Sequence, residues 1–500
     1  MKASDYIINT LANNGVTHIY QVIGGMITHL IDSADRNDRI QLVTMHHEQA
    51  AAFAVHSTGL LTGIPGVAMA TSGPGAVNLL TGIGSCYFDS IPAIFITGQV
   101  NLNEQKGDQP IRQLGFQETD IVNMAKPVTK AAWMIRSADQ IPQSLEDAFH
   151  IALSGRPGPV LLDIPMNIQR DQVEENIRTI QVDPEEFGDE GILEELFGAI
   201  QSAKRPLILA GGGIIVSHSI PLLQEFAETV KVPVVNSLLA VDALPFSHPY
   251  RVGLIGSYGN RWANLALGNC DLLLVMGSRL DIRQTGADVK AFQSGRTIFH
   301  VDNNSVEINA RVKNSRAIVA DVHSFLEKAL PLAKRIEFPK HAEWENQIQQ
   351  WHQQWPDVNE SAGFPGINPN QFMHDLSHNS SQAAGYVVDV GNHQMWAAQS
   401  LELSKGQFFI TSGGMGSMGF SLPAVIGASI TLNQAPIVEV SGDGGFQMNI
   451  QELETIAMHH LPIKMVIINN QSLGMVRQFP TTLLPRKICR HIQRLLCTGF

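Results

Sequence analysis

Two short polar motifs, each placed directly after an apolar run, carry the clearest chemistry in this sequence. The run IVEVS leads into Gly442, Asp443 and Gly444, and the run KMVII leads into Asn469 and Asn470. A carboxylate, an amide carbonyl and a backbone carbonyl are hard oxygen donors, which suit Mg²⁺ and leave its other positions for phosphate oxygens and water. Glycines beside the aspartate let the backbone approach a diphosphate closely. Either motif alone would be an ordinary turn or loop, but the pair predicts a site for Mg²⁺ and a diphosphate group.

The two apolar runs must be neighbouring parallel strands for these motifs to meet. The stretch IQELETIAMHH between them is long enough for a helix and its turns, as a crossover between parallel strands requires. Asp443 and Asn470 would then lie side by side at the carboxyl edge of a sheet, where open α/β folds bind their ligands.

The whole chain repeats this alternation of strand-like and helical stretches, which predicts an α/β fold with parallel sheets flanked by helices. Its 500 residues, 44% of them hydrophobic, are enough for about two to four domains. Three blocks are expected, at residues 1–165, 190–333 and 370–500. The first closes with the strand GPVLLDIP. The polar stretches 166–189 and 334–369 are interpreted as linkers.

Composition excludes several classes of partner. The net charge of −12 and the acidic pI near 5.8 leave no basic face for nucleic acid or an anionic membrane. No apolar run is long enough to span a bilayer, and the N-terminus reads as an amphipathic helix without a signal peptide. The four cysteines, which show no metal-binding or redox spacing, favour a reduced, cytoplasmic setting. They are Cys86, Cys270, Cys489 and Cys497.

The stretch MHHEQAAAFAVHSTGL places Glu48 at the entrance of an alanine-rich helix. A glutamate in a first helical turn complements the helix dipole and adds about 0.3–1 kcal/mol at an exposed position. The small residues that follow indicate close packing, where an unpaired carboxylate is costly and tends to belong to a functional site. From this window alone the helix-capping interpretation is favoured.

The GDG motif followed at this distance by NN resembles the thiamine-diphosphate binding motif. Several further segments are similar to the acetolactate synthase (acetohydroxyacid synthase)-like branch of the thiamine-diphosphate-dependent enzyme family, and the resemblance runs from the first residues to about Phe479. These segments are HHEQAAAFA, TSGPGAVNLLTGIGSCYFDSIPAIFITGQV, FQETDIV, GRPGPVLLDIP, DVGNHQMWAAQ and SGGMGSMGFSLPAVIGA. The resemblance implies three doubly wound parallel-sheet domains. They are a pyrimidine-binding domain (1–165), a central FAD-binding-like domain (190–333) and a truncated diphosphate- and Mg²⁺-binding domain (370–500).

The resemblance also implies an activity. Enzymes of this branch use thiamine diphosphate and Mg²⁺ to decarboxylate a 2-keto acid, here pyruvate, and transfer the two-carbon unit to a carbonyl acceptor. They are homodimers or homotetramers. The glutamate matching Glu48 hydrogen-bonds the aminopyrimidine ring of the cofactor and promotes its imino tautomer, a task for a carboxyl group that keeps its proton in a dry pocket.

Site residues follow from the resemblance position by position. The metal ligands are Asp443, Asn470 and the backbone carbonyl of Ser472. The other cofactor-binding positions are Gly25, Gly391, Asn392, His393, Gly416, Met418, Gly444, Gly445 and Met475. The positions that line the substrate pocket are Gln99, Phe116, Gln117, Lys130, Arg283, Val476 and Phe479.

Three of these positions bear on specificity. Asn392 stands where the family usually has glutamine, which keeps the donor and shortens its reach. Phe479 stands where biosynthetic relatives have tryptophan, which enlarges the acceptor pocket. Arg283 suits the carboxylate of a second 2-keto acid, and a surface or FAD-phosphate contact is an equal alternative.

FAD is a possible further cofactor in a structural role. The segments AGGGI, GLIGSYGNRWANLALGNCDLLLVMGSRLDIR and HVDNNSVEINARV are similar to flavin-binding stretches of acetolactate synthases. However, SYGN lacks the usual histidine, and Ile282 stands in place of an aspartate.

Other functions stay open. The acceptor could instead be the keto group of a nucleotide-linked deoxysugar. The basic, acid-free tail PTTLLPRKICRHIQRLLCTGF, where the resemblance stops, favours a truncated, poorly active or non-catalytic paralogue. A nicotinamide oxidoreductase is suggested by the glycines of TSGPGAVNLL and AGGGI, but neither completes the dinucleotide-binding fingerprint.

Overall fold

The structure, a computed structural model, describes every residue except 183–185, 361–362, 364–365 and 478–500. It divides into two compact units, one formed by residues 1–183 with 412–500 and the other by residues 184–411. Within the part of the chain that is described, none of the helices combines the length and the apolar character needed to cross a bilayer.

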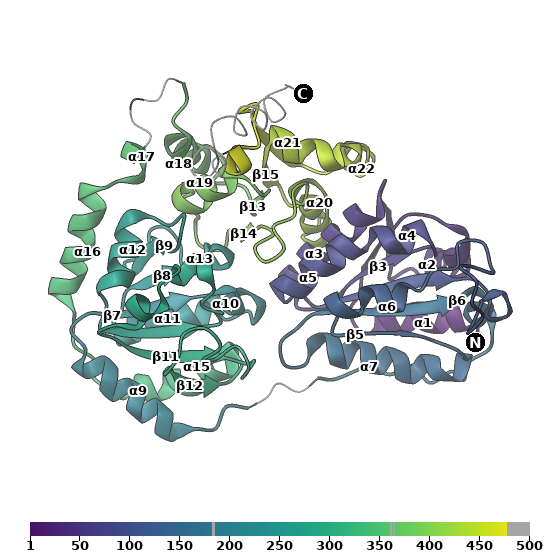
Figure 1. Cartoon of the computed structure of the whole chain (residues 1–500), viewed down its shortest axis with the longest axis horizontal. Coiled ribbons are helices and arrows are strands. Elements are labelled where there is room, and N and C mark those ends of the chain that lie inside the picture. Colours follow the sequence, from purple (N-terminus) through teal and green to yellow (C-terminus); the bar gives the residue numbers. More distant parts are fainter. Residues whose placement is uncertain (183–185, 361–362, 364–365, 478–500) are drawn as a thin grey trace. The chain divides into compact units, whose positions relative to one another are not determined.

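The N-terminal part of the first unit, residues 1–183, is built around a six-stranded sheet (Figure 1). All its strand pairs are parallel, in the order β2-β1-β3-β4-β6-β5. The central strands are buried along their whole length, which explains their uninterrupted apolar sequences. The strands are β1 (His18–Gln21), β2 (Gln41–Thr44), β3 (Gly66–Ala70), β4 (Ala93–Gln99), β5 (Ala131–Met134) and β6 (Pro159–Pro165). The helices are α1 (Ala3–Asn13), α2 (Thr28–Asp35), α3 (Glu48–Thr62), α4 (Pro74–Asn78), α5 (Leu80–Asp89), α6 (Ile121–Ala125), α7 (Ile141–Leu153) and α8 (Met166–Arg170).

Helix α3 is enclosed by two other helices of the same unit, α5 and α20 (Ser421–Thr431). A Cβ added to Gly82 of α5 would lie 2.2 Å from the Cβ of Ala52, and one added to Gly427 of α20 would lie 2.2 Å from the carbonyl oxygen of Ala54. Glycine is therefore required where both helices touch α3. The close packing expected from the alanine run is confirmed.

The second unit contains another parallel sheet of six strands, in the order β12-β11-β10-β7-β8-β9. Apolar clusters pack on its two faces. The strands are β7 (Pro206–Ala210), β8 (Val234–Asn236), β9 (Arg251–Leu254), β10 (Leu272–Met276), β11 (Thr297–Asp302) and β12 (Arg316–Val319). The helices up to residue 333 are α9 (Glu190–Ser202), α10 (Gly212–Val216), α11 (Ile220–Val230), α12 (Arg261–Asn269), α13 (Ile282–Thr285), α14 (Val289–Gln293) and α15 (Val322–Ala333).

The polar stretch 334–369 contains a regular helix, α16 (Ala342–Gln354), which lies alongside α12 (Figure 1). Trp344 and Ile348 of α16 are buried in the apolar cluster on this side of the sheet, and Trp351 packs against it. Part of the expected linker thus belongs to the core of the second unit. Further helices of this unit are α17 (Asp357–Glu360), α18 (Pro369–Asn379) and α19 (Asn392–Ser400).

A third parallel sheet has the strand order β14-β13-β15-β16. Its strands are β13 (Gly385–Val388), β14 (Phe408–Ile410), β15 (Ile437–Gly442) and β16 (Ile463–Ile468). The helices near β15 are α21 (Asp443–Phe446) and α22 (Leu453–Met458), with a 3₁₀ segment at Gln447–Glu452. Three parallel sheets flanked by helices confirm the expected α/β fold class.

Candidate active site

The two oxygen-rich motifs meet at one sheet edge. Strands β15 and β16 pair in parallel, with Gly442 opposite Ile468, so both strands end at the same level. Asp443 is the first residue after β15, and Asn470 follows β16 by two positions. The expected adjacency of these strands is confirmed, and it follows from the short crossover through α21 and α22.

The loop after β16 presents further oxygen atoms. The side-chain oxygen of Asn470 accepts the backbone N–H of Ser472 at 3.0 Å and keeps a second lone pair. The hydroxyl oxygen of Ser472 is buried and has no hydrogen-bond partner among the described residues. A buried polar atom without a partner is costly, so an additional ligand is expected here. No group of three or more His, Cys, Asp and Glu side chains is placed to hold a metal in the described ranges. A metal at this edge would therefore use amide and backbone oxygens beside a single carboxylate.

Close packing surrounds the glycines of the GDG motif. A Cβ on Gly444 would lie 2.7 Å from Leu473 Cδ2 and 3.7 Å from the terminal methyl group of Met418. Gly445 is buried. The segment holding Met418 thus approaches the start of α21, and Met418 lies near the metal-binding motif predicted from the sequence.

The segment 412–418 is held by polar contacts to α5. Asp89, at the end of α5, accepts the backbone N–H groups of Gly414 at 2.6 Å and Gly413 at 3.3 Å. His56 Nε2 lies 3.3 Å from Asp89 Oδ2, the oxygen that also accepts the N–H of Gly413, and the His56 ring packs on Phe420 at 4.9 Å. Gly416 has φ +68° and open space where a side chain would lie. Sequence reasoning missed Asp89 and His56 because no motif marks them. Their burial appears only in the folded chain.

Glu48 begins α3 and is partly exposed. Its Oε2 accepts a hydrogen bond from Asn78 Nδ2 at 2.9 Å. Its Oε1 accepts none in the described part of the chain, and a Cβ on Gly75 would lie 3.1 Å from it. One carboxylate oxygen is therefore fixed and the other is left available.

The start of α3 is also tied to the segment after the GDG motif. The backbone N–H of His46 donates to the buried carboxylate of Glu452 at 3.0 Å, and Asn449 Nδ2 donates to Gln49 Oε1 at 3.4 Å. Burial raises the pKa of Glu452, against hydrogen bonds from Thr455 and His46 that lower it. These contacts join the helix of Glu48 to the element that follows Asp443.

Comparison with known proteins identifies the family. Three family models match the chain. They describe the N-terminal TPP binding domain (residues 1–124), the central domain (193–329) and the C-terminal TPP binding domain (389–489) of thiamine pyrophosphate enzymes. The chain belongs to the thiamine pyrophosphate enzyme family.

Acetolactate synthases are among the similar members of this family. The Escherichia coli (strain K12) acetolactate synthase isozyme 2 large subunit is 33% identical over 479 residues, covering 96% of this chain and 85% of that protein. Chloroplastic acetolactate synthase 2 of Nicotiana tabacum is 35% identical over 490 residues, covering 96% and 72%. The probable large subunit of Methanocaldococcus jannaschii is 35% identical over 495 residues, covering 96% and 82%.

The pocket positions of this thiamine pyrophosphate enzyme in the first unit do not all lie together. Gln99 ends β4 at the carboxyl edge of the N-terminal sheet, where the loops of Gly25 and Glu48 also begin. Lys130 precedes β5 and binds the carbonyl of Ser154 at 2.6 Å, so it lies at the opposite edge. Burial lowers the pKa of Lys130 to about 8. The structure therefore does not bring Lys130 to Gln99 within this sheet.

The side chain of Gln99 is fully engaged inside the protein. Its Nε2 donates to the carbonyl of Thr119 at 2.8 Å and to Asp163 at 3.0 Å, while its Oε1 accepts the N–H of Val100. Asp163 is completely buried, and burial raises its pKa to about 7. Hydrogen bonds from Gln99 and Thr97 oppose that rise.

The neighbouring predicted residues differ in exposure. Phe116 is 79% exposed. Gln117 has φ +66° and packs closely on Gly73. A Cβ added to Gly73 would lie 2.9 Å from the Cβ of Gln117. Met475 is partly exposed and Val476 is half exposed. Phe479 and the tail lie outside the described residues.

Four predicted residues belong to the second unit. Gly391, Asn392 and His393 stand at the start of α19, with Gly391 preceding the helix. Burial lowers the pKa of His393 to about 4, and its Nε2 has no partner among the described residues. Arg283 lies in the short helix α13 with an exposed side chain.

Proposed function

We propose that this thiamine pyrophosphate enzyme is a carboligase that decarboxylates a 2-keto acid, pyruvate, and transfers the two-carbon unit to a carbonyl acceptor. Similarity to acetolactate synthases over 96% of the chain is the observation that supports this reaction class. When bound, thiamine diphosphate supplies the electron sink for the bonding pair that stays on the former keto carbon when CO₂ leaves.

The residues at the edge of β15 and β16 fit a magnesium diphosphate. Asp443 supplies its carboxylate, Asn470 its side-chain carbonyl oxygen and Ser472 its backbone carbonyl oxygen. The buried, unpartnered hydroxyl of Ser472 favours a ligand at this place. A Mg²⁺ shell with few protein ligands keeps positions for phosphate oxygens. Gly391, Asn392 and His393, at the start of a helix, are proposed for the diphosphate itself.

Glu48 is proposed as the proton-handling residue. Because Asn78 holds Oε2, the carboxyl group has one preferred orientation, and Oε1 is the atom available to share a proton with a ring nitrogen. Gly75 leaves the space that this oxygen needs, since any side chain there would approach it. The position of Glu48 at the start of α3 thus serves more than helix capping.

We propose FAD as a further cofactor, with a structural role. At the carboxyl edge of the second sheet, a Cβ on Gly211 would lie 2.2 Å from the carbonyl oxygen of Gly277, and one on Gly213 would lie 2.6 Å from Gly277 Cα. Two backbone segments pack directly on each other here, which accounts for these glycines without a ligand. The absorbance spectrum of the purified protein tests for bound flavin.

We propose that the chain assembles as a homodimer or homotetramer, as the enzymes that it resembles do. Glu48 and Asp443 come from different domains, and in the resembled enzymes two subunits hold the two ends of one cofactor. Mixing Glu48→Gln with Asp443→Ala subunits is then expected to recover activity, because one hybrid site carries neither change. A verified mixed oligomer without recovery contradicts shared sites.

An acceptor screen tests the reaction. The full chain is incubated with ¹³C-labelled pyruvate, thiamine diphosphate and Mg²⁺, and NMR follows the label with pyruvate alone, with added 2-keto acids, and with a nucleotide-linked keto-deoxysugar. Labelled acetolactate from pyruvate alone is expected. Consumption of pyruvate without any carbon–carbon bond formation would refute the carboligase assignment.

A further inference from the structure

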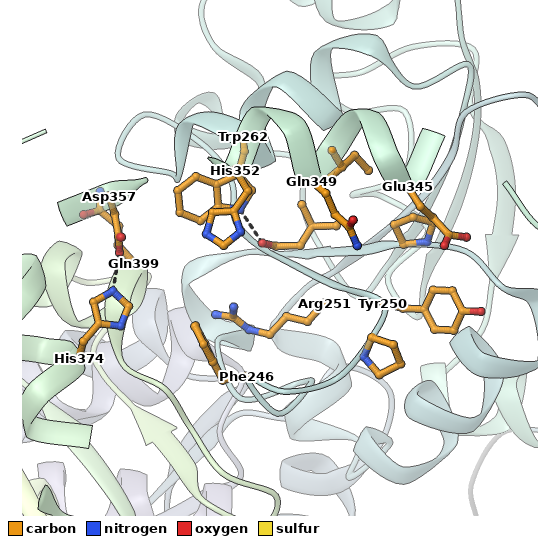
Figure 2. A pocket seen from close by; sticks show the side chains of 14 residues that line it. Phe246, Tyr250, Arg251, Trp262, Glu345, Gln349, His352, Asp357, His374 and Gln399 are labelled. Carbon is orange, nitrogen blue, oxygen red and sulfur yellow. Dashed lines mark hydrogen bonds and ion pairs between the residues drawn. The ribbon is translucent and has the colours of Figure 1, made fainter. Parts of the chain in front are cut away.

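A separate cavity of about 250 Å³ lies in the second unit at the amino-terminal edge of its sheet (Figure 2). Pro233 directly precedes β8 and Arg251 is the first residue of β9, and both line it. The glycine loops at Gly211 and Gly277 follow the carboxyl ends of β7 and β10, at the other edge. The cavity is therefore distinct from the flavin-like edge and from every residue assigned to the thiamine diphosphate site.

Helix α16, from the stretch that the sequence presented as a linker, forms one wall. Four residues of this helix line the cavity: Glu345, Ile348, Gln349 and His352. The last three follow Glu345 by three, four and seven positions, so all four share one helix face. Figure 2 shows His352 and Gln349 above Arg251, and Glu345 farther along, above Tyr250. The His352 ring lies 4.2 Å from that of Trp262.

Arg251 lines the cavity with a cationic side chain. Its guanidinium carbon lies 4.9 Å from the centre of the Phe246 ring, and no hydrogen bond or ion pair holds the guanidinium within the described residues. Arg296 offers a contrast, since it lies over Phe292 at 5.1 Å but donates to the carbonyl of Leu267 at 2.6 Å. The guanidinium of Arg251, which has five N–H donors, therefore has no protein acceptor among the described residues.

The two carboxylates near Arg251, those of Glu402 and Asp357, form no ion pair with it among the described residues. Burial lowers its pKa to about 10, although the carboxylates of Glu402 and Asp357 act against that fall. Asp357 is engaged by His374 Nε2 at 3.1 Å and by the hydroxyl of Ser400. Glu402 is engaged by His374 Nδ1 at 2.7 Å. Both nearby carboxylates therefore have their own partners.

We propose that this cavity binds a small organic monocarboxylate with a flat apolar body, its carboxylate paired with the guanidinium of Arg251. A planar carboxylate matches the two parallel N–H groups of a guanidinium. Trp262, Ile348 and Pro233 supply apolar wall for the rest of the molecule. Asp357 and Glu345 also line the cavity, and their charges disfavour a dianion such as a phosphate ester.

Benzoate is the probe, with benzamide as the uncharged analogue of the same shape and inorganic phosphate as the competing anion. Isothermal titration calorimetry on the full chain is expected to show benzoate binding and little heat with benzamide or phosphate. Arg251→Gln is expected to weaken benzoate at least about tenfold. Arg296→Gln, which changes an arginine of similar setting away from the cavity, is expected to leave the affinity unchanged.

A second variant fills the cavity without touching the charge. Ile348→Trp is expected to weaken benzoate while Arg251 is intact, and it gives an answer even if Arg251→Gln does not fold. The proposal is overturned if the parent protein does not bind benzoate, if benzamide or phosphate binds equally well, or if the folded variants bind benzoate like the parent.

Discussion

The carboxylate of Asp89 accepts the backbone N–H of Gly414 at 2.6 Å. This contact joins the C-terminal end of α5 to the segment that carries Gly416 and Met418, far away in the sequence. Both residues that we propose for the cofactor therefore lie in a segment that is hydrogen-bonded to this carboxylate.

Asp89→Asn is expected to lower the free energy of unfolding by about 1–3 kcal/mol, because at least one of the buried contacts to Gly413, Gly414 or His56 loses its acceptor. Hydrogen exchange of residues 412–420 should rise, and thiamine diphosphate should bind more weakly. Urea denaturation and exchange mass spectrometry measure these effects. Asp32→Asn, in an exposed ion pair, is the control, and equal exchange in both variants would contradict the role of Asp89.

Glu48→Gln is expected to bind thiamine diphosphate but to lose about 10²–10⁴-fold in turnover, because an amide cannot exchange a proton with the cofactor ring. Steady-state assays with pyruvate and calorimetry of cofactor binding separate the two effects. Glu454→Gln, an exposed glutamate on α22, serves as the matched control. Near-parental turnover of Glu48→Gln would remove this residue from the mechanism.

Asp443→Ala is expected to abolish Mg²⁺-dependent retention of thiamine diphosphate while leaving thermal unfolding of the cofactor-free protein nearly unchanged. The reason is that the site has one carboxylate, so its loss removes the charged ligand from a small shell. Gel filtration with cofactor, with and without a chelator, measures retention. Chelator-sensitive retention equal to the parent would show that the metal is held elsewhere.

Asp163→Asn is expected to stabilise the protein increasingly as pH rises. Burial raises the pKa of Asp163 to about 7 from an unfolded value of 3.8, so the folded state binds the proton more tightly. The parent therefore loses stability between about pH 4 and 7 through this group, by up to about 4 kcal/mol, and the asparagine variant avoids that loss.

Thermal unfolding of parent and variant at pH 5 and pH 8 measures the difference. Asp147→Asn changes an exposed carboxylate on α7 and should show no pH-dependent advantage. A constant difference between parent and Asp163→Asn across this range would mean that Asp163 does not titrate there.

The sequence predicted the parallel sheets and the common edge at which β15 and β16 end, because both depend on local patterns. Buried parallel strands are continuous apolar runs, and a polar motif after each of two such runs locates a shared edge once the strands are adjacent. Asp443 and Asn470 were found in this way. By contrast, Asp89 acts through a contact with Gly414 that no local pattern contains.

Two stretches differ from the secondary structure expected from the sequence. The stretch IQELETIAMHH was expected to hold a helix and its turns; it holds α22, but its first three residues belong to the 3₁₀ segment Gln447–Glu452. Asn449, which directly precedes the stretch, leaves helical geometry at φ −131°. Its side chain donates instead to the carbonyl of Gly419 at 2.7 Å. In the stretch 334–369, overall polarity hid the helical spacing of Trp344, Ile348 and Trp351, which would have indicated α16.

Helix α16 sets a limit on exchanging domains between this chain and its relatives. Trp344 donates its indole N–H to the carbonyl of Pro206, the first residue of β7, and Ile348 is buried in the same cluster as Trp262. A chimera joined between residues 334 and 342 would take α16 from one parent and the sheet from the other. Its two surfaces would then be mismatched, so a recombination point that keeps residues 206–354 from a single parent preserves the core.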